Sequence, residues 1–290
     1  MSATIYQIVT DRITALLEKG VIPWQMPWTS NQQPPQNLIS RKPYRGINTL
    51  LLHSMGHASP FWLTFRQAQG LGGHVKQGEK GTPVIFWHWS DVENKATGET
   101  ERIPFLRYYS LFNVAQCEGI ETPTTSEPVR EHSAVEAAEQ IVAGMSKRPE
   151  IQHGLNRAFY SPVKDTVGMP QPEQFKSPEH YYSVLFHELT HSTGHECRLN
   201  RKGVSRTEGK FAAFGSDKYA QEELVAEMGA AFLCGQAGIA ERTVDNSAAY
   251  IASWLQRLKS DPKLVVQAAG QAQKASDWIL GRNEETAHCE

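Results

Sequence analysis

The 290-residue sequence has few of the features that mark a secreted or membrane-spanning protein. Its four cysteines are widely spaced, contain no CxxC pair and are too sparse for a disulfide scaffold, so we expect a reducing compartment. The first residues lack the basic start and apolar core of a signal peptide. The longest charge-free stretches, 20–40 and 46–65, are interrupted by Pro, Gly, Asn and Gln, so neither predicts a membrane span. These absences favour a cytoplasmic protein with no membrane partner.

Net charge is also small, because 29 Lys+Arg stand against 31 Asp+Glu and leave −2. A uniformly basic nucleic-acid-binding protein is thereby excluded. The charge is nevertheless uneven: residues 1–125 hold 11 basic and 9 acidic residues, a balance of +2, and the remainder holds 18 and 22, a balance of −4. Residues 20–90 contain six basic residues against one acidic residue, together with five of the seven tryptophans. Any nucleic-acid contact is therefore expected in the first part of the chain.

A stretch rich in Thr, Pro, Ser and Glu at 121–132 has little apolar content and predicts an exposed linker. It divides the chain into an expected first domain, 1–125, and an expected second domain, 126–290. Both parts combine helical and strand patterns, and the second is mainly helical, so we predict a two-domain α+β fold.

Apolar residues at spacings of three and four predict an amphipathic helix at the start of the chain, which Gly20 ends. The proline-rich segment 23–36 should be extended along the surface. Further along, alternating aromatic residues after a glycine-bounded turn predict a strand. Helices are expected over 5–17, 46–56 and 61–69, and strands over 82–89 and 105–114.

The mixture of aromatic and basic residues in this first part suits single-stranded nucleic acid. Aromatic rings stack on bases, and Lys and Arg neutralise phosphates. For Trp24 and Trp28, contact with bases and burial in a core are both open, whereas Trp62 and Phe86 favour the core. The candidate DNA-binding residues are Trp24, Trp28, Arg41, Lys42, Tyr44, Arg45, Arg66, Lys76 and Lys80.

The most specific motif is HELTH at residues 187–191. On a helix, His187 and His191 lie one turn apart on the same face and can bind one Zn(II), with Glu188 beside them. Ser177 as an N-cap and Gly194 as a stop predict such a helix. If a metal binds there, it lowers the pKa of its water toward ~7 and Glu188 accepts the proton, which is the chemistry of metal-assisted hydrolysis.

A catalytic zinc site needs a third protein ligand and one open position. The metzincin pattern would place that ligand at 197, where this sequence has Cys197, and His195 lies close to the helix end but stays open as a ligand. An alanine-rich helix downstream carries Glu223 and Glu227 one turn apart. We expect Glu223 to bind the metal and Glu227 to orient a ligand histidine through a hydrogen bond, with Glu222 as the alternative ligand.

Two further features belong to this second part. The segment 158–170 alternates like a strand and predicts an edge strand with which an extended peptide could pair. Tyr160 and Tyr219 lie near the motif segments and are candidates for an oxyanion donor, although a structural role is the simpler interpretation. Residues 247–281 predict two helices separated by Asp261-Pro262.

Several long segments, in order along nearly the whole chain, closely resemble the plasmid-encoded antirestriction protein ArdC family. They are PYRGINTLLL, WLTFRQAQGLGGHVKQGEKGTPVIFW, YSLFNVAQCEGI, FHELTHSTGHECRL and FGSDKYAQEELVAE. The resemblance implies an N-terminal single-stranded-DNA-binding domain and a C-terminal zincin-like metallopeptidase domain. It also implies a role in conjugation, in which incoming plasmid DNA is shielded from the recipient's restriction enzymes. The family pattern places the metal ligands, Zn(II) or another divalent ion such as Mn(II), at His187, His191 and Glu223, with Glu188 as the catalytic glutamate.

The resemblance leaves open whether peptide cleavage occurs, since a zincin module can keep its metal as a structural element. One alternative is a cytoplasmic zinc-dependent protease whose first domain recognises protein substrates. Another is a DNA-coating protein whose metal only stabilises the second domain. Besides single-stranded DNA, the partners to consider are host restriction endonuclease subunits or another protein substrate.

Overall fold

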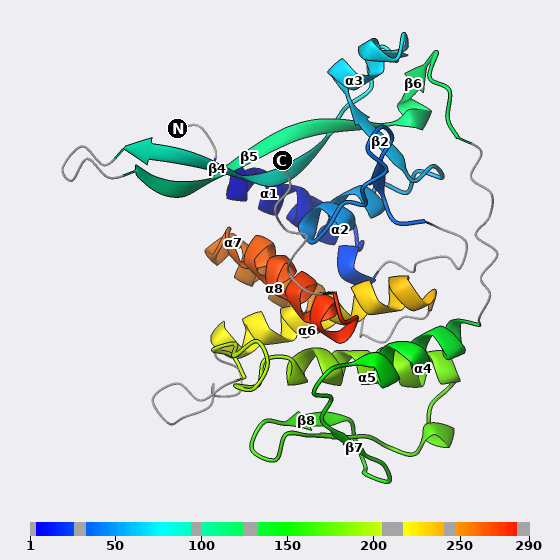
Figure 1. Cartoon of the computed structure of the whole chain (residues 1–290), viewed down its shortest axis with the longest axis vertical. Coiled ribbons are helices and arrows are strands. Elements are labelled where there is room, and N and C mark those ends of the chain that lie inside the picture. The colour runs from blue at the N-terminus through cyan, green and yellow to red at the C-terminus, as the bar shows by residue number, and fades with distance from the viewer. Residues whose placement is uncertain are drawn as a thin grey trace.

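The computed structural model describes residues 4–25, 33–93, 100–123, 133–204, 217–240 and 248–282, with the side chains of 89–104 and of 217 outside the description. Strands and helices both contribute, which confirms the α+β class. Figure 1 shows a long strand ribbon at one end, stacked helices in the middle and a small sheet at the other end. Most of the predicted linker at 121–132, and Trp28, lie outside the described residues.

The first helices of the chain agree with the sequence. Helix α1 (Ile5–Leu17) begins where the Thr4 side chain accepts a hydrogen bond from the Gln7 backbone amide, which is an N-cap. Helix α2 (Ile47–His53) follows Gly46. Between them, the 3-10 turn η1 (Pro23–Gln25) lies in the proline-rich segment.

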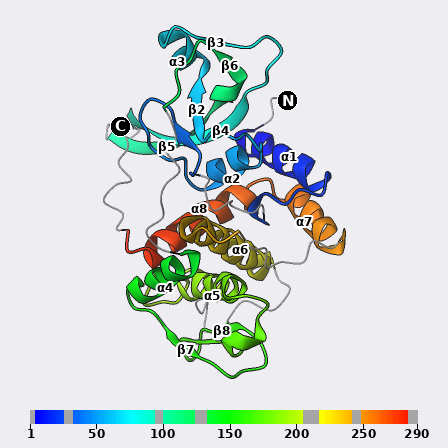
Figure 2. The same cartoon turned by 90° about the vertical axis from the view of Figure 1, so that its right-hand side faces the viewer.

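The main sheet has four strands in the order β1-β2-β5-β4. Its long strands pair antiparallel from Thr82 opposite Leu111 to Glu93 opposite Thr100, and Figure 1 shows them extending as a ribbon beyond the shorter strands. A two-stranded sheet joins β3 and β6 beside it. Figure 2 shows the main sheet and the β7–β8 region on opposite sides of the helices. The elements are β1 (Gln36–Asn37), β2 (Phe61–Thr64), β3 (His74–Val75), β4 (Thr82–Glu93), β5 (Thr100–Asn113), η2 (Val114–Gln116) and β6 (Cys117–Glu118).

One expectation for this region was wrong. The segment 61–69 is not a single helix, because its first four residues form β2 between β1 and β5, and helix α3 (Phe65–Gly70) begins only afterwards. Consecutive residues Trp62 and Leu63 are 1% and 0% exposed, a pattern that fits a strand covered on both faces. Thr64 then starts the helix through a reciprocal capping box with Gln67.

The second part is mainly helical and also carries a three-stranded sheet in the order β7-β9-β8. The expected edge strand 158–170 is a hairpin instead, because the chain reverses at Asp165, which adopts a φ of 50°. Among the described helices, none has the length and hydropathy to cross a bilayer. The elements are α4 (Ala134–Gly144), β7 (Glu150–Gln152), β8 (Phe159–Ser161), β9 (Thr166–Gly168), η3 (Pro172–Gln174), α5 (Pro178–Ser192), α6 (Asp217–Ala237), α7 (Ala248–Ser260) and α8 (Leu264–Ile279).

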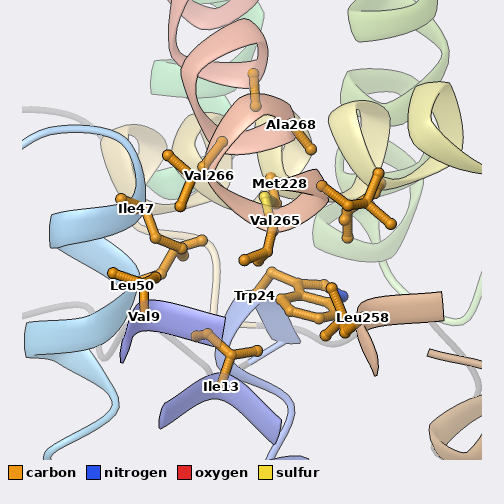
Figure 3. Close-up of a cluster of buried hydrophobic side chains, with 14 of the residues drawn as sticks. Val9, Ile13, Trp24, Ile47, Leu50, Met228, Leu258, Val265, Val266 and Ala268 are labelled. Atoms are coloured by element: carbon orange, nitrogen blue, oxygen red, sulfur yellow. The ribbon is translucent and has the colours of Figure 1, made fainter. Parts of the chain in front are cut away.

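The two parts of the chain share a hydrophobic core. Figure 3 shows side chains from α1, η1 and α2 packed against side chains from α6, α7 and α8. Because burying these apolar faces supplies much of the stability of either part, residues 1–125 alone would expose a large apolar surface. The domain boundary at residue 125 stays a prediction. Because the two parts share this core, experiments should use the whole chain. The labelled residues are Val9, Ile13, Trp24, Ile47, Leu50, Met228, Leu258, Val265, Val266 and Ala268.

Candidate metal centre

Helix α5 carries the two histidines of the HELTH motif. It begins as expected at Ser177, whose hydroxyl accepts a 3.1 Å hydrogen bond from the His180 amide, and it continues to Ser192. His187 and His191 therefore lie one turn apart, and their Nε2 atoms are 3.2 Å apart. Glu188 lies next to His187 and is only 8% exposed.

Helix α6 supplies the third side chain because it packs closely on α5. At Gly229 a Cβ atom would lie 2.5 Å from Cγ2 of Thr190, so the two helices can approach this closely only with glycine at that position. The approach brings Glu223 against both histidines, with Oε2 3.6 Å from Nε2 of His187 and Oε1 3.6 Å from Nε2 of His191.

These three side chains fit a divalent metal. Their donor atoms all lie within 4.8 Å of one another, with separations of 3.2 to 3.6 Å between the nearest pairs. Ligands at ~2.0–2.2 Å in a tetrahedral zinc site lie roughly 3.3–3.5 Å apart, so little movement is needed. Two imidazoles and one carboxylate suit Zn(II) or Mn(II). The structure thus brings together the three residues that the sequence predicted as ligands.

Glu222 has a different role from the one considered for it as a ligand. Its Oε1 lies 3.3 Å from Nδ1 of His191, and Arg201 donates hydrogen bonds to both oxygens of the same carboxylate. Arg201 also donates a 2.8 Å hydrogen bond to the backbone carbonyl of Thr190. Glu222 is therefore fixed by Arg201 and orients His191, a task that the sequence had assigned to Glu227.

Glu227 lies in a different network. Its Oε2 accepts a 2.8 Å hydrogen bond from the indole Nε1 of Trp24 and another from the hydroxyl of Tyr250. Trp24 is 2% exposed, so its ring cannot stack on a base in this conformation. The expected roles of Trp24 in DNA binding and of Glu227 in orienting His191 are thereby corrected: these residues contact each other in the shared core.

The charges in the centre are arranged around a protonated His191. Burial by itself lowers the pKa of His191, but its hydrogen bonds with Glu222 and Glu223 outweigh burial and raise that pKa to about 10. Burial raises the pKa of Glu223, yet its hydrogen bonds with His187 and His191 hold it far below the ordinary value. Burial likewise raises the pKa of Glu222, and the positive charge of Arg201 lowers it below the ordinary value. Two carboxylates thus stabilise positive charge here.

The metzincin alternative does not fit this geometry. Cys197 lies in a separate cluster, where its Sγ is 3.1 Å from Nδ1 of His195, and both side chains are near Asp165. Arg198 forms an ion pair with Asp165, and the hydroxyl of Tyr160 donates a 2.8 Å hydrogen bond to the same carboxylate. Tyr160 thus has the structural role that was the simpler interpretation.

Tyr219 is nearer the centre. Burial and then a hydrogen bond with Glu223 raise the pKa of its phenol to about 12, so the phenol remains a hydrogen-bond donor at neutral pH. Its side chain is half-buried.

The remaining DNA-binding candidates are spread over the surface of the first part. Arg45 forms an ion pair with Asp277 on α8, so it also connects the two parts of the chain. Tyr44 is half-buried, and its ring centroid lies 6.4 Å from that of Phe86. The exposed candidates are Arg41, Lys42, Arg45, Arg66, Lys76 and Lys80.

The strands β4 and β5 carry a group of exposed aromatic residues that the sequence did not predict. Phe86 was expected in the core, yet it is 40% exposed on β4, and four neighbours on β4 and β5 are exposed as well. The available signal was the succession of aromatic residues at adjacent strand positions, because adjacent side chains point to opposite faces and one core covers only one face. The group is Phe86, Trp87, Phe105, Tyr108 and Tyr109.

Comparisons with known proteins match two family models to different parts of the chain. Residues 3–112 match the N-terminal domain of the anti-restriction factor ArdC, and residues 136–271 match a zincin-like metallopeptidase family. The antirestriction protein ArdC of plasmid R388 is 36% identical in its metal-free crystal structure, with a TM-score of 0.76 over 97% of this chain and 98% of that one. Its Mn(II)-bound structure gives 35% identity and a TM-score of 0.73 over 98% and 100% of the two chains.

Two curated relatives are also similar over 95% of this chain. The uncharacterized protein y4eC of Sinorhizobium fredii is 36% identical and is covered over 91% of its length. DNA primase TraC of Escherichia coli is 35% identical, and the match spans only 27% of that longer protein. The fold and the His-His-Glu cluster define a zincin-like protein with an added N-terminal domain. Together with the matched family models, they show that the chain belongs to the ArdC antirestriction family.

Proposed function

We propose that this protein binds single-stranded DNA and protects incoming plasmid DNA from host restriction enzymes during conjugation. The observation that carries the proposal is the similarity to ArdC along 97% of the chain, with the His187, His191 and Glu223 cluster assembled in it. We also propose a cytoplasmic location and the chain divisions 1–125 and 126–290 as the DNA-binding and metal-binding parts.

We propose a divalent metal, Zn(II) or Mn(II), as the cofactor of this site. When bound, the metal supplies a Lewis acid and lowers the pKa of a coordinated water. The chain contributes the rest: His187, His191 and Glu223 hold the ion, and Glu222 orients His191 through its Nδ1. Glu188, buried beside His187, is the proposed proton acceptor.

A second candidate function is a zinc-dependent protease, with a restriction endonuclease subunit or another protein as its substrate. The observation that favours it is strand β8, which pairs only with β9 among the described residues and contacts the ligand helix α5. Such an edge can bind an extended peptide through backbone hydrogen bonds. The variant Glu188→Gln tests this candidate, because it should keep the metal and lose any peptide hydrolysis.

Direct binding measurements on the whole chain test the leading proposal. Fluorescence anisotropy with labelled oligonucleotides should show binding to single strands that weakens as salt is raised, because phosphate contacts release counterions. A duplex of the same sequence should bind more weakly, since its base faces are hidden in the stack. Absence of binding to single strands at low salt would contradict the proposed function.

A further inference from the structure

We infer that single-stranded DNA lies across one face of the β4–β5 ribbon, on an aromatic platform formed by Tyr44, Phe86, Phe105 and Tyr109 with Arg107 between them. This inference rests on the proposed function and assigns its binding surface. It moves the stacking residues away from the proline-rich segment that the sequence suggested, because Trp24 is buried there.

The strand register places these residues on the same face. Val84 lies opposite Tyr109, Phe86 opposite Arg107, and His88 opposite Phe105. Residues directly opposite each other in an antiparallel pair project from the same face, and positions two apart along a strand do so too. The six side chains thus form three successive cross-strand pairs.

This face passes from the core to the surface along the ribbon. Val84 is fully buried in a cluster with Leu52 and Trp62. Its cross-strand partner Tyr109 is 46% exposed, Phe86 in the next pair is 40% exposed, and Phe105 in the pair after that is 44% exposed. Rings that are held at one edge and open at the other are available to a ligand without any rearrangement of the core.

Neighbouring rings hold the platform in place. The centroids of Phe86 and Tyr109 are 5.6 Å apart with their planes at 67°, and the Tyr44 ring lies 6.4 Å from that of Phe86 with its plane tilted by 58°. These aromatic contacts, edge-to-face for Phe86 and Tyr109, stabilise the rings in one arrangement. A preorganised aromatic surface lowers the entropy cost of binding a base.

The opposite face of the ribbon has a different environment. Ile85 belongs to the large core that includes α1, and the partly buried Leu106 packs against that core. Trp87 and Tyr108 share that face and are 56% and 50% exposed. Trp87 and Tyr108 are as exposed and as aromatic as the platform residues but lie on the opposite face. Substitutions of these two residues therefore serve as controls for substitutions on the platform.

The charge and the aromatic character of this face indicate which class of ligand it can bind. The side chains described on this face of the ribbon include Arg107 and His88 and no carboxylate. Aromatic rings interleaved with cations suit a polyanion with exposed rings of its own. Single-stranded DNA meets both conditions, whereas a duplex offers only phosphates to this surface.

The spacing indicates how the strand would be held. Positions two apart on a β-strand are separated by ~6.8 Å, which is about twice the 3.4 Å step between bases of one strand in duplex DNA. Bases resting on successive pairs would therefore be unstacked from each other and stacked on protein rings. Such binding tolerates any sequence, because every base has a ring face.

The test measures affinity of the whole chain for a fluorescein-labelled oligo(dT) by anisotropy. Phe86→Ala and Tyr109→Ala should each weaken binding by about 5- to 150-fold, the effect of losing one stacking partner. Phe86→Leu keeps an apolar contact with Tyr44 but has no ring, so it should also weaken binding of the oligonucleotide. Trp87→Ala and Tyr108→Ala on the opposite face should match wild type. Arg107→Ala should reduce the slope of log affinity against log salt by about 0.7, one phosphate contact.

The possible results are distinct. If wild type binds and the Phe86 and Tyr109 variants bind equally well, the platform is wrong while the proposed function stands. Equal weakening by the opposite-face controls would also overturn the platform. If wild type binds no single strand, both the proposed function and this inference fail. Circular dichroism of each variant establishes that it is folded, and Phe86→Leu keeps the test informative if an alanine variant is not.

Discussion

The indole Nε1 of Trp24 donates a 2.8 Å hydrogen bond to the carboxylate of Glu227, one helical turn along α6 from the proposed metal ligand Glu223. Trp24 also packs edge-to-face on Trp254 of α7, with ring centroids 6.1 Å apart. A residue near the start of the chain thus supports the helix that completes the metal centre. The two sequence families in this chain therefore form a single structural unit around Trp24.

Removal of the Trp24 ring should destabilise the whole chain. Trp24→Ala leaves a large cavity in the shared core and deprives Glu227 of a donor, so we expect a loss of roughly 3–5 kcal/mol in the free energy of unfolding. Urea denaturation followed by circular dichroism measures it. Trp87→Ala, an equally large change at a side chain that is 56% exposed, should stay within about 0.5 kcal/mol of wild type. Equal effects of the two would contradict the buried position of Trp24.

The stability of the metal-free protein should depend on pH through Glu227. Burial raises the pKa of this carboxyl from 4.5 to about 7, although Tyr250, His187 and Trp24 each lower it and Glu223 raises it further. Between pH 4.5 and about 7, the Glu227 carboxyl therefore keeps its proton in the folded state and has lost it in the unfolded state. Within that window, stability falls as pH rises, by about 3 kcal/mol in total.

Glu227→Gln is the matched variant, since an uncharged amide cannot titrate. Its unfolding free energy, measured with EDTA present, should change less between pH 5 and 7.5 than that of wild type. If the two pH profiles are parallel, Glu227 does not titrate in that range.

Metal binding should release protons near neutral pH. The carboxylates of Glu222 and Glu223 raise the pKa of His191 to about 10, so the metal-free centre holds a proton that a ligand histidine must lose. Apparent affinity should then rise by roughly tenfold per pH unit between pH 6 and 8 for one released proton. Titration calorimetry with Mn(II) in buffers of different ionisation enthalpy counts these protons, and a count of zero would contradict a protonated His191.

Glu222 and Glu223 should differ in their effect on the metal. Glu223→Gln removes a ligand, whereas Glu222→Gln only weakens the hold on His191 and should lower affinity by about 10- to 100-fold. Glu173→Gln, on an exposed turn, is the control and should bind as wild type does. A larger loss in the Glu222 variant than in the Glu223 variant would reverse the assignment of ligand and orienting residue.

The sequence predicted which side chains lie together in the candidate metal centre because its signals there are local. HELTH has a helical spacing, and Glu223 with Glu227 has the same one-turn spacing, so faces could be assigned without a tertiary structure. The partner of His191 was missed because Glu222 and Glu223 are adjacent, and only the packing angle of α6 decides which carboxylate faces which nitrogen. Arg201, which fixes Glu222, comes from a turn after α5 and has no spacing signal.

The first part of the chain was harder to predict. Long strands and the amphipathic helix α1 follow directly from periodicity, but β2 resembled a helix because its buried run is short and continues into α3. The composition suggested the tryptophans as DNA-binding residues. The exposure of a side chain depends, however, on which face of its helix or strand the rest of the chain covers. Trp24 and Trp62 are buried as a result, and Phe86 is exposed.

The central claim is tested most directly by plasmid transfer into restricting recipient cells. Recovery of the plasmid should be higher when this protein is produced than with an empty vector, and the difference should vanish in recipients without the restriction enzyme. The variant Phe86→Ala with Tyr109→Ala should lose this protection, and Trp87→Ala should retain it. Equal plasmid recovery with and without the wild-type protein in restricting recipients would contradict the account.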